Sequence, residues 1–268
     1  MKRKETAVIV RQVSLGGGIC DMTLQAPLTA GDAMPGQFVD LFVNDAGKLL
    51  PRPISLCGID REAGYLRLVY RMQGEGTRLL AGMKAGEKLE LLGPLGNGFP
   101  LSEAAGKTVY LIGGGIGIPP MLETAKALFE KQKTSAEDAP ARIVSVLGYR
   151  DDTFLLDEFK QYGDVIIATE DGSCGTKGNV LDAIAADGAF PELCFACGPK
   201  PMLRALKNWA ADRQIPCWIS MEERMACGIG ACLACVCKTA DKDPHSQVNN
   251  TRVCADGPVF PAEYLDLE

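Results

Sequence analysis

The first hundred residues alternate short apolar runs with glycine, proline and polar breaks. Period-two alternation within such runs is typical of half-buried strands, and the breaks between them are typical of turns. One short piece, Thr77–Met83, has helical spacing instead. This pattern predicts a small antiparallel β-barrel. Its six strands are expected at Thr6–Val13, Cys20–Gln25, Gln37–Val43, Ile54–Ile59, Tyr65–Arg71 and Lys88–Leu92.

From Thr108 the pattern changes, because apolar runs now alternate with longer amphipathic segments. Strand and helix in alternation predict a doubly wound parallel sheet with helices on both faces. The strands are expected at Thr108–Ile112, Arg142–Gly148, Asp164–Thr169, Leu193–Ala196 and Cys217–Ser220. The helices are expected at Pro119–Lys131, Phe154–Gln161, Asn179–Ala186 and Pro201–Ala211.

After Ser220 this alternation ends, and the remaining tail is too short to bury a large core of its own. A metal centre can stabilise such a tail in place of a core. The predicted fold is therefore multidomain, α/β plus β. It has a barrel at 1–100, a nucleotide domain at 101–220 and a small cysteine-rich domain at 221–268.

The amino-acid composition excludes several classes of function and does not change the predicted fold. The chain has 268 residues, 47% of them hydrophobic, which is enough to form hydrophobic cores. A net charge of −6 and a pI near 5.1 argue against nucleic acid and against anionic membranes. The N-terminal apolar run ends at Arg11, which is too short for a signal peptide, and no run approaches a membrane span. We expect a cytoplasmic protein.

A single histidine, His245, leaves little room for histidine acid–base catalysis or histidine metal sites. Cofactors must therefore carry the reaction, and no catalytic side chain is expected. Three cysteines lie together in residues 227–235, CGIGACLAC, and Cys254 follows after a gap. Four residues separate Cys227 from Cys232, and two separate Cys232 from Cys235. This spacing matches the plant-type ligand pattern of a [2Fe–2S] cluster. Small residues let the loop curl and aim backbone N–H groups at the sulfurs.

Zinc and disulfides are the alternative uses of these thiols. Structural zinc sites usually pair two short CxxC-like motifs, and this spacing differs. The 11 cysteines of the chain are too dilute for a stapled secreted scaffold. Cys237 is a second candidate for the fourth ligand, because it would share a strand face with Cys235. Cys254 is favoured, since a ligand from a separate segment closes the cluster from the far side.

A glycine loop opens the second domain, where residues 109–120, VYLIGGGIGIPP, run from a strand through Gly113–Gly117 into a helix. Glycines let a pyrophosphate approach the backbone, and a helix N-terminus favours its charge. Prolines are tolerated in the first helical turn. The spacing is not the Rossmann GxGxxG, and no acidic residue ends the next strand at the usual distance. We predict a nucleotide site here. A turn that serves only packing is the alternative.

Three further motifs are weaker. Cys197–Met202, CGPKPM, follows a strand at the end where open α/β sheets bind ligands. In the barrel, the arginine of Arg52–Ser55, RPIS, and the helix start at Gly74–Thr77, GEGT, suggest a diphosphate site. Tyr70 is positioned in sequence to flank a flat ring. An ordinary turn and a helix cap are the alternative explanations.

The order of these motifs resembles the ferredoxin-reductase superfamily, in which a flavin barrel precedes a pyridine-nucleotide domain. The tail sequences MEERMAC (221–227) and VCADGPVF (253–260) make the resemblance more specific, to one family within this superfamily. The whole chain resembles the electron-transfer subunits of class B dihydroorotate dehydrogenase, and the resemblance covers all three segments in order.

The resemblance implies three cofactors: FAD, NAD(H) and a [2Fe–2S] cluster. FAD would contact Arg52, Pro53, Ile54, Ser55, Val69, Tyr70, Arg71, Gly76 and Thr77. NAD(H) would lie across Gly113, Gly114, Gly115, Gly117, Cys197, Gly198 and Pro199. The cluster ligands would be Cys227, Cys232, Cys235 and Cys254. Residues 148–152, GYRDD, contain a cation that would suit the 2′-phosphate of NADP and acids that would repel it. The sequence alone therefore does not distinguish NAD from NADP.

The family also implies a partner, an FMN-containing catalytic subunit that oxidises dihydroorotate, in a heterotetramer with two copies of each subunit. Electrons would pass singly through the cluster, be paired on FAD and leave as hydride to NAD+, in pyrimidine biosynthesis. The alternatives are a ferredoxin–NAD(P) reductase or sulfide-dehydrogenase-like subunit with another electron partner, and a non-catalytic redox or nucleotide sensor.

Overall fold

The computed structural model describes residues 2–45, 47–135, 137–243 and 247–268, so His245 lies outside the described residues. The chain folds as two compact units. One contains Met1–Gly98, Glu222–Cys237 and Thr251–Pro258, and the other contains Phe99–Met221, Lys238–Asn250 and Val259–Glu268. The first three cysteines of the predicted cluster and Cys254 thus belong to the same unit as the barrel. The division into three domains at residues 100 and 220 stays a prediction.

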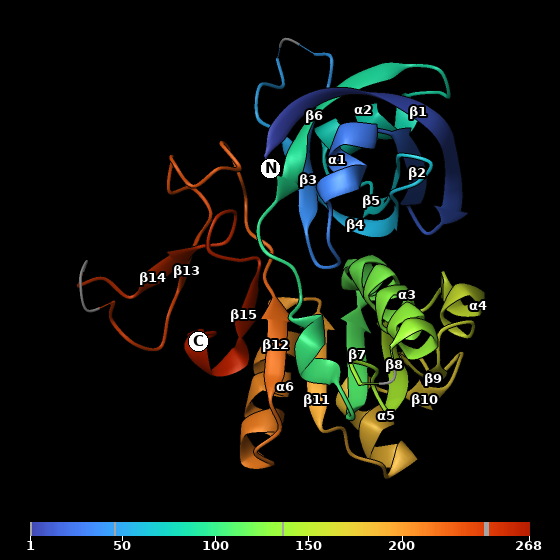
Figure 1. Cartoon of the computed structure of the whole chain (residues 1–268), viewed down its shortest axis with the longest axis vertical. Coiled ribbons are helices and arrows are strands. Elements are labelled where there is room, and N and C mark those ends of the chain that lie inside the picture. The colour runs from blue at the N-terminus through green and yellow to red at the C-terminus, as the bar shows by residue number, and fades with distance from the viewer. Residues whose placement is uncertain (1, 46, 136, 244–246) are drawn as a thin grey trace. The chain divides into compact units, whose positions relative to one another are not determined.

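The first unit is built on a closed six-stranded antiparallel barrel in the order β1-β2-β5-β4-β3-β6, as the alternation predicted (Figure 1). Its strands are β1 (Arg3–Gly16), β2 (Ile19–Gln25), β3 (Phe38–Phe42), β4 (Arg52–Asp60), β5 (Tyr65–Arg71) and β6 (Lys88–Leu95). The strand β1 is longer than predicted because its first half pairs with β6 and its second half with β2. Alternate side chains, among them Met22, Leu24, Leu41, Leu56 and Leu68, fill the interior.

Two helices accompany the barrel, α1 (Pro27–Asp32) and α2 (Glu75–Gly82). The sequence predicted α2, two residues later, and missed α1. The reason is that α1 has no capping side chain of its own. Glu5, from β1, instead accepts hydrogen bonds from the backbone N–H groups of Leu28 at 3.1 Å and Thr29 at 2.8 Å. A cap supplied by a distant strand leaves no local signal.

The second unit is built on a seven-stranded sheet in the order β10-β9-β8-β7-β11-β12-β15. The strands are β7 (Thr108–Gly114), β8 (Arg142–Tyr149), β9 (Asp164–Thr169), β10 (Thr176–Lys177), β11 (Leu193–Cys197), β12 (Cys217–Ser220) and β15 (Val259–Pro261). All neighbours are parallel except β15, which pairs antiparallel with β12. The sequence predicted the five main parallel strands but not the recruitment of the tail as an edge strand.

Four helices connect these strands: α3 (Ile118–Thr134), α4 (Leu156–Phe159), α5 (Val180–Asp187) and α6 (Lys200–Asp212). The prediction of a helix over Phe154–Gln161 was too long, because only one turn forms. Leu155 adopts a left-handed conformation, and the Tyr149 hydroxyl donates to the Phe154 carbonyl at 2.7 Å, which holds Phe154 outside the helix. The strand order reverses between β7 and β11, and such a reversal is where open α/β sheets bind ligands.

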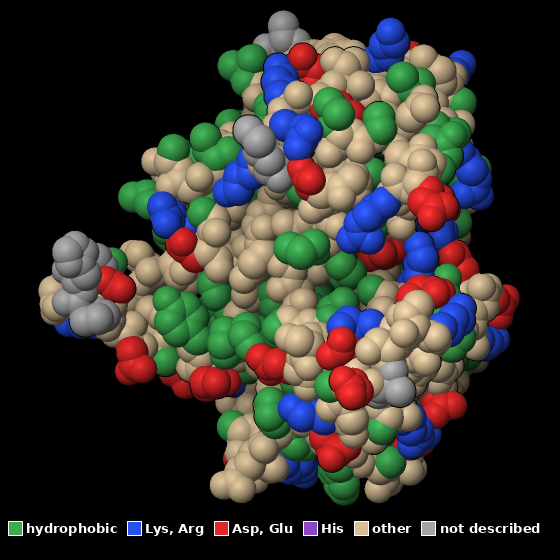
Figure 2. All heavy atoms as spheres, viewed as in Figure 1, with side chains coloured by type: hydrophobic (Ala, Val, Ile, Leu, Met, Phe, Trp, Pro, Cys, Tyr) green, Lys and Arg blue, Asp and Glu red, His purple; other side chains and the backbone are tan. Residues whose placement is uncertain are grey.

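The remaining elements are short. A two-stranded sheet joins β13 (Val236–Lys238) to β14 (Asn250–Arg252), and three single 3₁₀ turns lie at Leu101–Ala104, Gly115–Gly117 and Ala262–Tyr264. Among the described residues, no helix is both long and apolar enough to cross a bilayer. On the face shown in Figure 2, Lys and Arg side chains are interspersed with Asp and Glu, so the described part of this face presents no continuous basic patch.

Candidate functional site

The glycine loop after β7 lies in close contact with the loop after β11. Gly113 is the register partner of Cys197, so the two strands end side by side. A Cβ on Gly117 would overlap the Cys197 carbonyl group. The structure therefore brings together the two segments expected to bind NAD(H), Gly113–Gly117 and Cys197–Pro199, at the reversal of the sheet.

Helix α3 begins directly after this loop. Its 17 residues start with Ile118, Pro119 and Pro120, as the first-turn prolines predicted. The Pro residues supply no N–H group, so the unpaired donors of the first turn come from the neighbouring positions. The loop backbone and the partial positive charge of the helix N-terminus together suit a diphosphate.

A second site suited to an anion lies on the barrel, where β4 begins beside the first turn of α2. The Arg52 guanidinium occupies the space that a Cβ on Gly76 would need, and it donates to the Leu50 carbonyl. The Lys48 ammonium pairs with the Glu75 carboxylate at 2.7 Å at the same turn. Only glycine at position 76 lets the arginine lie against the helix N-terminus. The Arg52 guanidinium at a helix start suits one end of a diphosphate, while Glu75 neutralises the Lys48 charge at the same turn.

Thr77 and Tyr70 both direct their side chains to partners within the protein. The Thr77 hydroxyl accepts the backbone N–H groups of Gln73 at 3.0 Å and Gly74 at 3.1 Å, so it caps its own helix. Tyr70 is 1% exposed and packs in the barrel core beside Cys20. Burial, with the nearby Cys20 thiol, raises the pKa of the Tyr70 hydroxyl. The expectation that the Tyr70 ring flanks a flat ligand is wrong, because strand alternation turns its side chain inward.

The other barrel residues expected at a flavin site lie at the barrel surface with unequal exposure. Pro53, Ile54 and Ser55 are half-buried along β4, and Arg71 is exposed at the end of β5. The Val69 side chain is 3% exposed, which leaves mainly its backbone for ligand contact.

The cysteine loop 227–235 turns through two glycines in left-handed conformations, Gly228 at φ +65° and Gly230 at φ +90°. Its backbone N–H groups point at the first thiol: the Cys232 N–H lies 3.4 Å from the Cys227 Sγ. Desolvation raises the pKa of the Cys227 thiol, but hydrogen bonds from the backbone of Ile229, Cys232 and Ala231 and from the Cys232 side chain outweigh it, and the pKa falls to about 6. A thiol that ionises this readily is prepared to ligate a metal.

Cys235 and Cys254 form a second, buried pair. The Cys254 N–H lies 3.4 Å from the Cys235 Sγ, and the two thiols also interact through their side chains. Burial, and then the Cys235 thiol, raises the pKa of Cys254 to about 12, while the Gly230 backbone N–H partly opposes this rise. The same N–H···S contacts stabilise the thiolate form once a cation is present.

The four thiols thus lie as two pairs, Cys227 with Cys232 and Cys235 with Cys254. Within the described ranges, no three His, Cys, Asp or Glu side chains are grouped around a single ready-made ion position. A [2Fe–2S] cluster has two irons with four cysteine ligands in all, so two thiol pairs suit it. The donor set fits a two-iron cluster better than one tetrahedral zinc.

A buried acid lies beneath the start of this loop. Asp40, on β3, is 0% exposed, and a Cβ on Gly228 would overlap its carboxylate. Neither carboxylate oxygen has a hydrogen-bond partner among the described residues. Burial, and then the charge of Cys227, raises the pKa of Asp40 to about 7. Asp40 was not among the predicted site residues, although an acid inside the apolar run Gln37–Val43 is an available signal.

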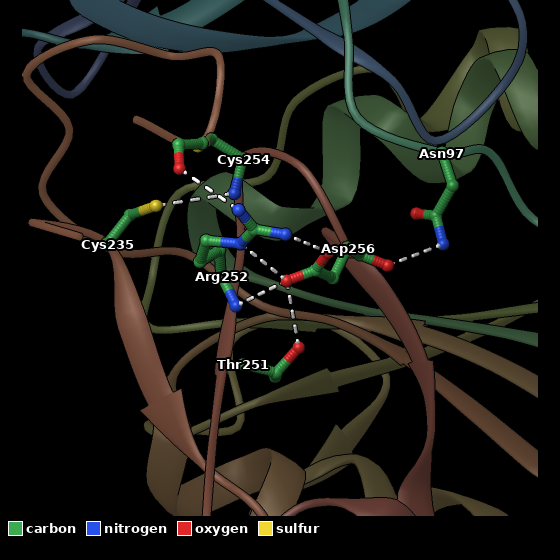
Figure 3. Close-up of polar contacts among 7 residues, drawn as sticks. Asn97, Cys235, Thr251, Arg252, Cys254 and Asp256 are labelled. Atoms are coloured by element: carbon green, nitrogen blue, oxygen red, sulfur yellow. Dashed lines mark hydrogen bonds and ion pairs between the residues drawn. The ribbon is translucent and has the colours of Figure 1, made fainter. Parts of the chain in front are cut away.

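Arg252 and Asp256 were not predicted either, and they stand two residues before and two residues after Cys254. The Arg252 Nη2 lies 2.9 Å from the Asp256 Oδ1 (Figure 3). Once Cys254 is a candidate ligand, the opposite charges two residues to either side of it are a sequence pattern that could have predicted an ion pair there.

Comparisons with known proteins agree with this arrangement. Residues 222–266 match the profile of the iron–sulfur cluster binding domain of dihydroorotate dehydrogenase B. Residues 111–208 match an oxidoreductase NAD-binding domain, and residues 9–99 match an oxidoreductase FAD-binding domain. The three matched regions follow one another in the order that the motifs predicted.

Relatives similar over nearly the whole chain carry the same name. The dihydroorotate dehydrogenase B (NAD(+)) electron transfer subunit of Geobacillus sp. (strain WCH70) is 44% identical over 266 residues, which cover 98% of each chain. That of Bacillus cereus (strain B4264) is 42% identical, over 97% of this chain and 98% of its own. Among solved structures, an NADH-dependent reduced ferredoxin-NADP oxidoreductase superposes with a TM-score of 0.82 at 29% identity, covering 97% of this chain and 90% of that one.

Proposed function

The chain belongs to the family of dihydroorotate dehydrogenase B (NAD(+)) electron transfer subunits, and we propose that it carries electrons between a dihydroorotate-oxidising partner and NAD+. The observation that carries the proposal is the pairing of Cys227 with Cys232 and of Cys235 with Cys254. Two thiol pairs in one unit with a flavin-type barrel suit an electron carrier rather than a catalyst of pyrimidine chemistry.

The residues have separate tasks in this proposal. Cys227, Cys232, Cys235 and Cys254 hold the [2Fe–2S] cluster. Arg52 and the first turn of α2 hold the FAD diphosphate, next to the half-buried surface of β4. The glycine loop and Cys197–Pro199 hold the NAD(H) diphosphate. When bound, the cluster supplies single-electron exchange and FAD converts it to the two-electron exchange that NAD+ requires.

The partner is, in this proposal, a catalytic subunit that contains FMN and binds the pyrimidine, in a heterotetramer with two copies of each subunit. The complex works in the cytoplasm. The family name implies a second subunit, since an electron transfer subunit has to exchange electrons with a catalytic one.

The first test is an absorption and EPR spectrum of the anaerobically purified chain before and after addition of NADH. We expect flavin bleaching together with the signal of a reduced [2Fe–2S] cluster. A tetrahedral zinc protein without flavin would contradict the proposal. NADH-dependent dye reduction by the isolated chain distinguishes an electron carrier from a redox sensor.

The ligand set is tested by two matched cysteine variants. Cys254→Ser is expected to lose the cluster absorption, because it removes one thiolate of the buried pair. Cys237→Ser is the control, because Cys237 is also buried and lies in the same segment as Cys235. Loss of the cluster from Cys237→Ser with its retention in Cys254→Ser would reverse the assignment.

A ferredoxin–NADP reductase is the alternative function, favoured by the solved relative at 29% identity. The identity of the electron partner distinguishes the proposed function from this alternative. Co-purification with a dihydroorotate-oxidising flavoprotein supports the proposal, whereas reduction of ferredoxin without such a partner supports the alternative.

A further inference from the structure

The candidate ligand Cys254 lies in a turn whose two flanking residues, Arg252 and Asp256, form an ion pair. The Arg252 guanidinium donates to both oxygens of Asp256, with Nη2–Oδ1 and Nε–Oδ2 distances of 2.9 Å each (Figure 3). The Arg252 backbone N–H also donates to Asp256 Oδ2 at 3.0 Å. This two-pronged geometry fixes the turn that carries Cys254, because an arginine fork binds a carboxylate in one plane.

The same guanidinium reaches the loop that carries the other three cysteines. Its Nη1 donates to the Gly230 carbonyl at 3.1 Å. A Cβ on Gly230 would lie 2.8 Å from the Ala255 Cβ, so the two segments are in close contact there. Arg252 therefore connects the segments that supply all four thiols.

Asp256 connects the turn to the barrel side of the same unit. Its backbone carbonyl accepts from the Asn97 side-chain amide at 3.3 Å (Figure 3). The Asn97 backbone N–H donates to the Gly257 carbonyl at 2.7 Å. Thr251 adds a longer contact to the Asp256 carboxylate at 3.4 Å. The backbone at Asp256 is thus held independently of the arginine, whereas its carboxylate is held mainly by Arg252.

The pair also places charge near the buried thiols. The Arg252 guanidinium interacts electrostatically with Cys254 and Cys235, in addition to its dominant interaction with Asp256. Reduction of a [2Fe–2S] cluster adds one negative charge to it. A nearby cation favours the reduced state, and a nearby carboxylate opposes it.

We propose that Arg252 and Asp256 are positioning residues that set the reduction potential of the cluster through their opposite charges beside the Cys235–Cys254 pair. This inference rests on the proposed [2Fe–2S] site. Arg252 raises the potential, and Asp256 lowers it by neutralising part of the arginine charge. The two residues share one ion pair, yet they act on the cluster in opposite directions.

The test is an anaerobic redox titration of the full chain, followed by absorption and EPR, for the wild type, Arg252→Gln and Asp256→Asn. At a fixed ambient potential we expect the ratio of reduced to oxidised cluster to fall about fivefold in Arg252→Gln and to rise by a similar factor in Asp256→Asn. Both variants break the same ion pair, so a purely structural role predicts shifts in one direction.

Arg252→Lys keeps the charge but loses the fork, and its potential is expected to stay close to that of the wild type. Arg142→Gln breaks an exposed ion pair with Asp164 on β8 and β9 and is expected to have no effect. Equal potentials in all variants, shifts of the same sign in Arg252→Gln and Asp256→Asn, or loss of the cluster from both would overturn the inference. Absence of a [2Fe–2S] signal from the wild type would instead overturn the proposed function.

Discussion

The glycine loop after β7 and the cysteine loop 227–235 are both tight turns of small residues, but different forces fix them. Gly117 lies against the Cys197 backbone, and Gly113 and Gly117 are buried. In the cysteine loop, Ile229 and Leu233 are more than half exposed, and the ordering contacts run from N–H groups to sulfur. One loop is shaped by packing before its ligand arrives, whereas the other is close-packed only at Gly228 and Gly230 and also depends on polar contacts that a metal completes.

This difference predicts how each loop responds to perturbation. A packed loop tolerates loss of its ligand but not an added atom. A loop held by thiolates tolerates small changes of volume at its exposed positions but not loss of the metal. Four experiments separate the two cases.

The largest effect is expected from Gly117→Ala. The added Cβ would overlap the Cys197 carbonyl group, so the backbone of one loop has to move. NADH-dependent flavin reduction should fall about a hundredfold, because a displacement of this kind disturbs the alignment of the bound nucleotide. Stopped-flow reduction kinetics measure it. Gly82→Ala on α2 is the control, since a Cβ there meets nothing within 4 Å, and an equal loss in that variant would contradict the packing argument.

The second effect concerns Asp40, which the cysteine loop covers. Its carboxyl has a raised pKa near 7, so between about pH 4 and pH 7 the unfolded chain releases this proton while the native chain keeps it. The native state then binds more protons, and the free energy of unfolding falls as the pH rises through this window. The loss is complete about one pH unit above pH 7.

Asp40→Asn removes the pH-dependent contribution of this carboxyl to the free energy of unfolding. The stability lost between pH 5 and pH 8 should be smaller in the variant than in the wild type by about 2 kcal/mol. Urea unfolding at the two pH values measures it. Asp60→Asn, at the exposed end of β4, serves as the control. If Asp40→Asn and the wild type had the same pH dependence, the carboxyl would not be buried as described.

Removal of iron should have a smaller but sharply localised effect. After chelation under anaerobic conditions, amide hydrogen exchange at Ile229, Ala231 and Cys232 should accelerate about tenfold, because the Cys227 sulfur that accepts their N–H groups is then no longer tied through iron to the other cysteines. Exchange in the glycine loop should stay unchanged. Equal acceleration in both loops would show that the metal orders the whole chain.

The smallest effect is expected at Leu233, which adopts φ +59° without being glycine. Asparagine tolerates this conformation better, so Leu233→Asn should relieve roughly 0.5–1 kcal/mol of strain. Iron release to a chelator should then slow about threefold. Ile229→Asn is the matched control, because Ile229 is also an exposed apolar residue of this loop and does not have a positive φ. Faster release from Leu233→Asn would contradict this account.

Local patterns determined much of this protein. Apolar alternation and turn residues predicted the barrel strands, and β5, β9 and β12 were predicted to the residue. The prolines at 119 and 120 marked the start of α3 within one position. The cysteine spacing predicted the chemistry of the tail. These signals are readable because each depends on residues that lie a few positions apart.

Tertiary structure decided what depends on residues that are distant in sequence. Glu5 caps α1, the tail adds β15 to the sheet, and Tyr70 turns into the barrel core instead of toward a ligand. Long-range packing also places Cys254 against Cys235, Arg252 against Gly230 and Asp40 beneath Gly228. A sequence states which residues are available, but their pairing across 20 or 200 positions is decided only when the whole unit buries its core and satisfies its polar groups.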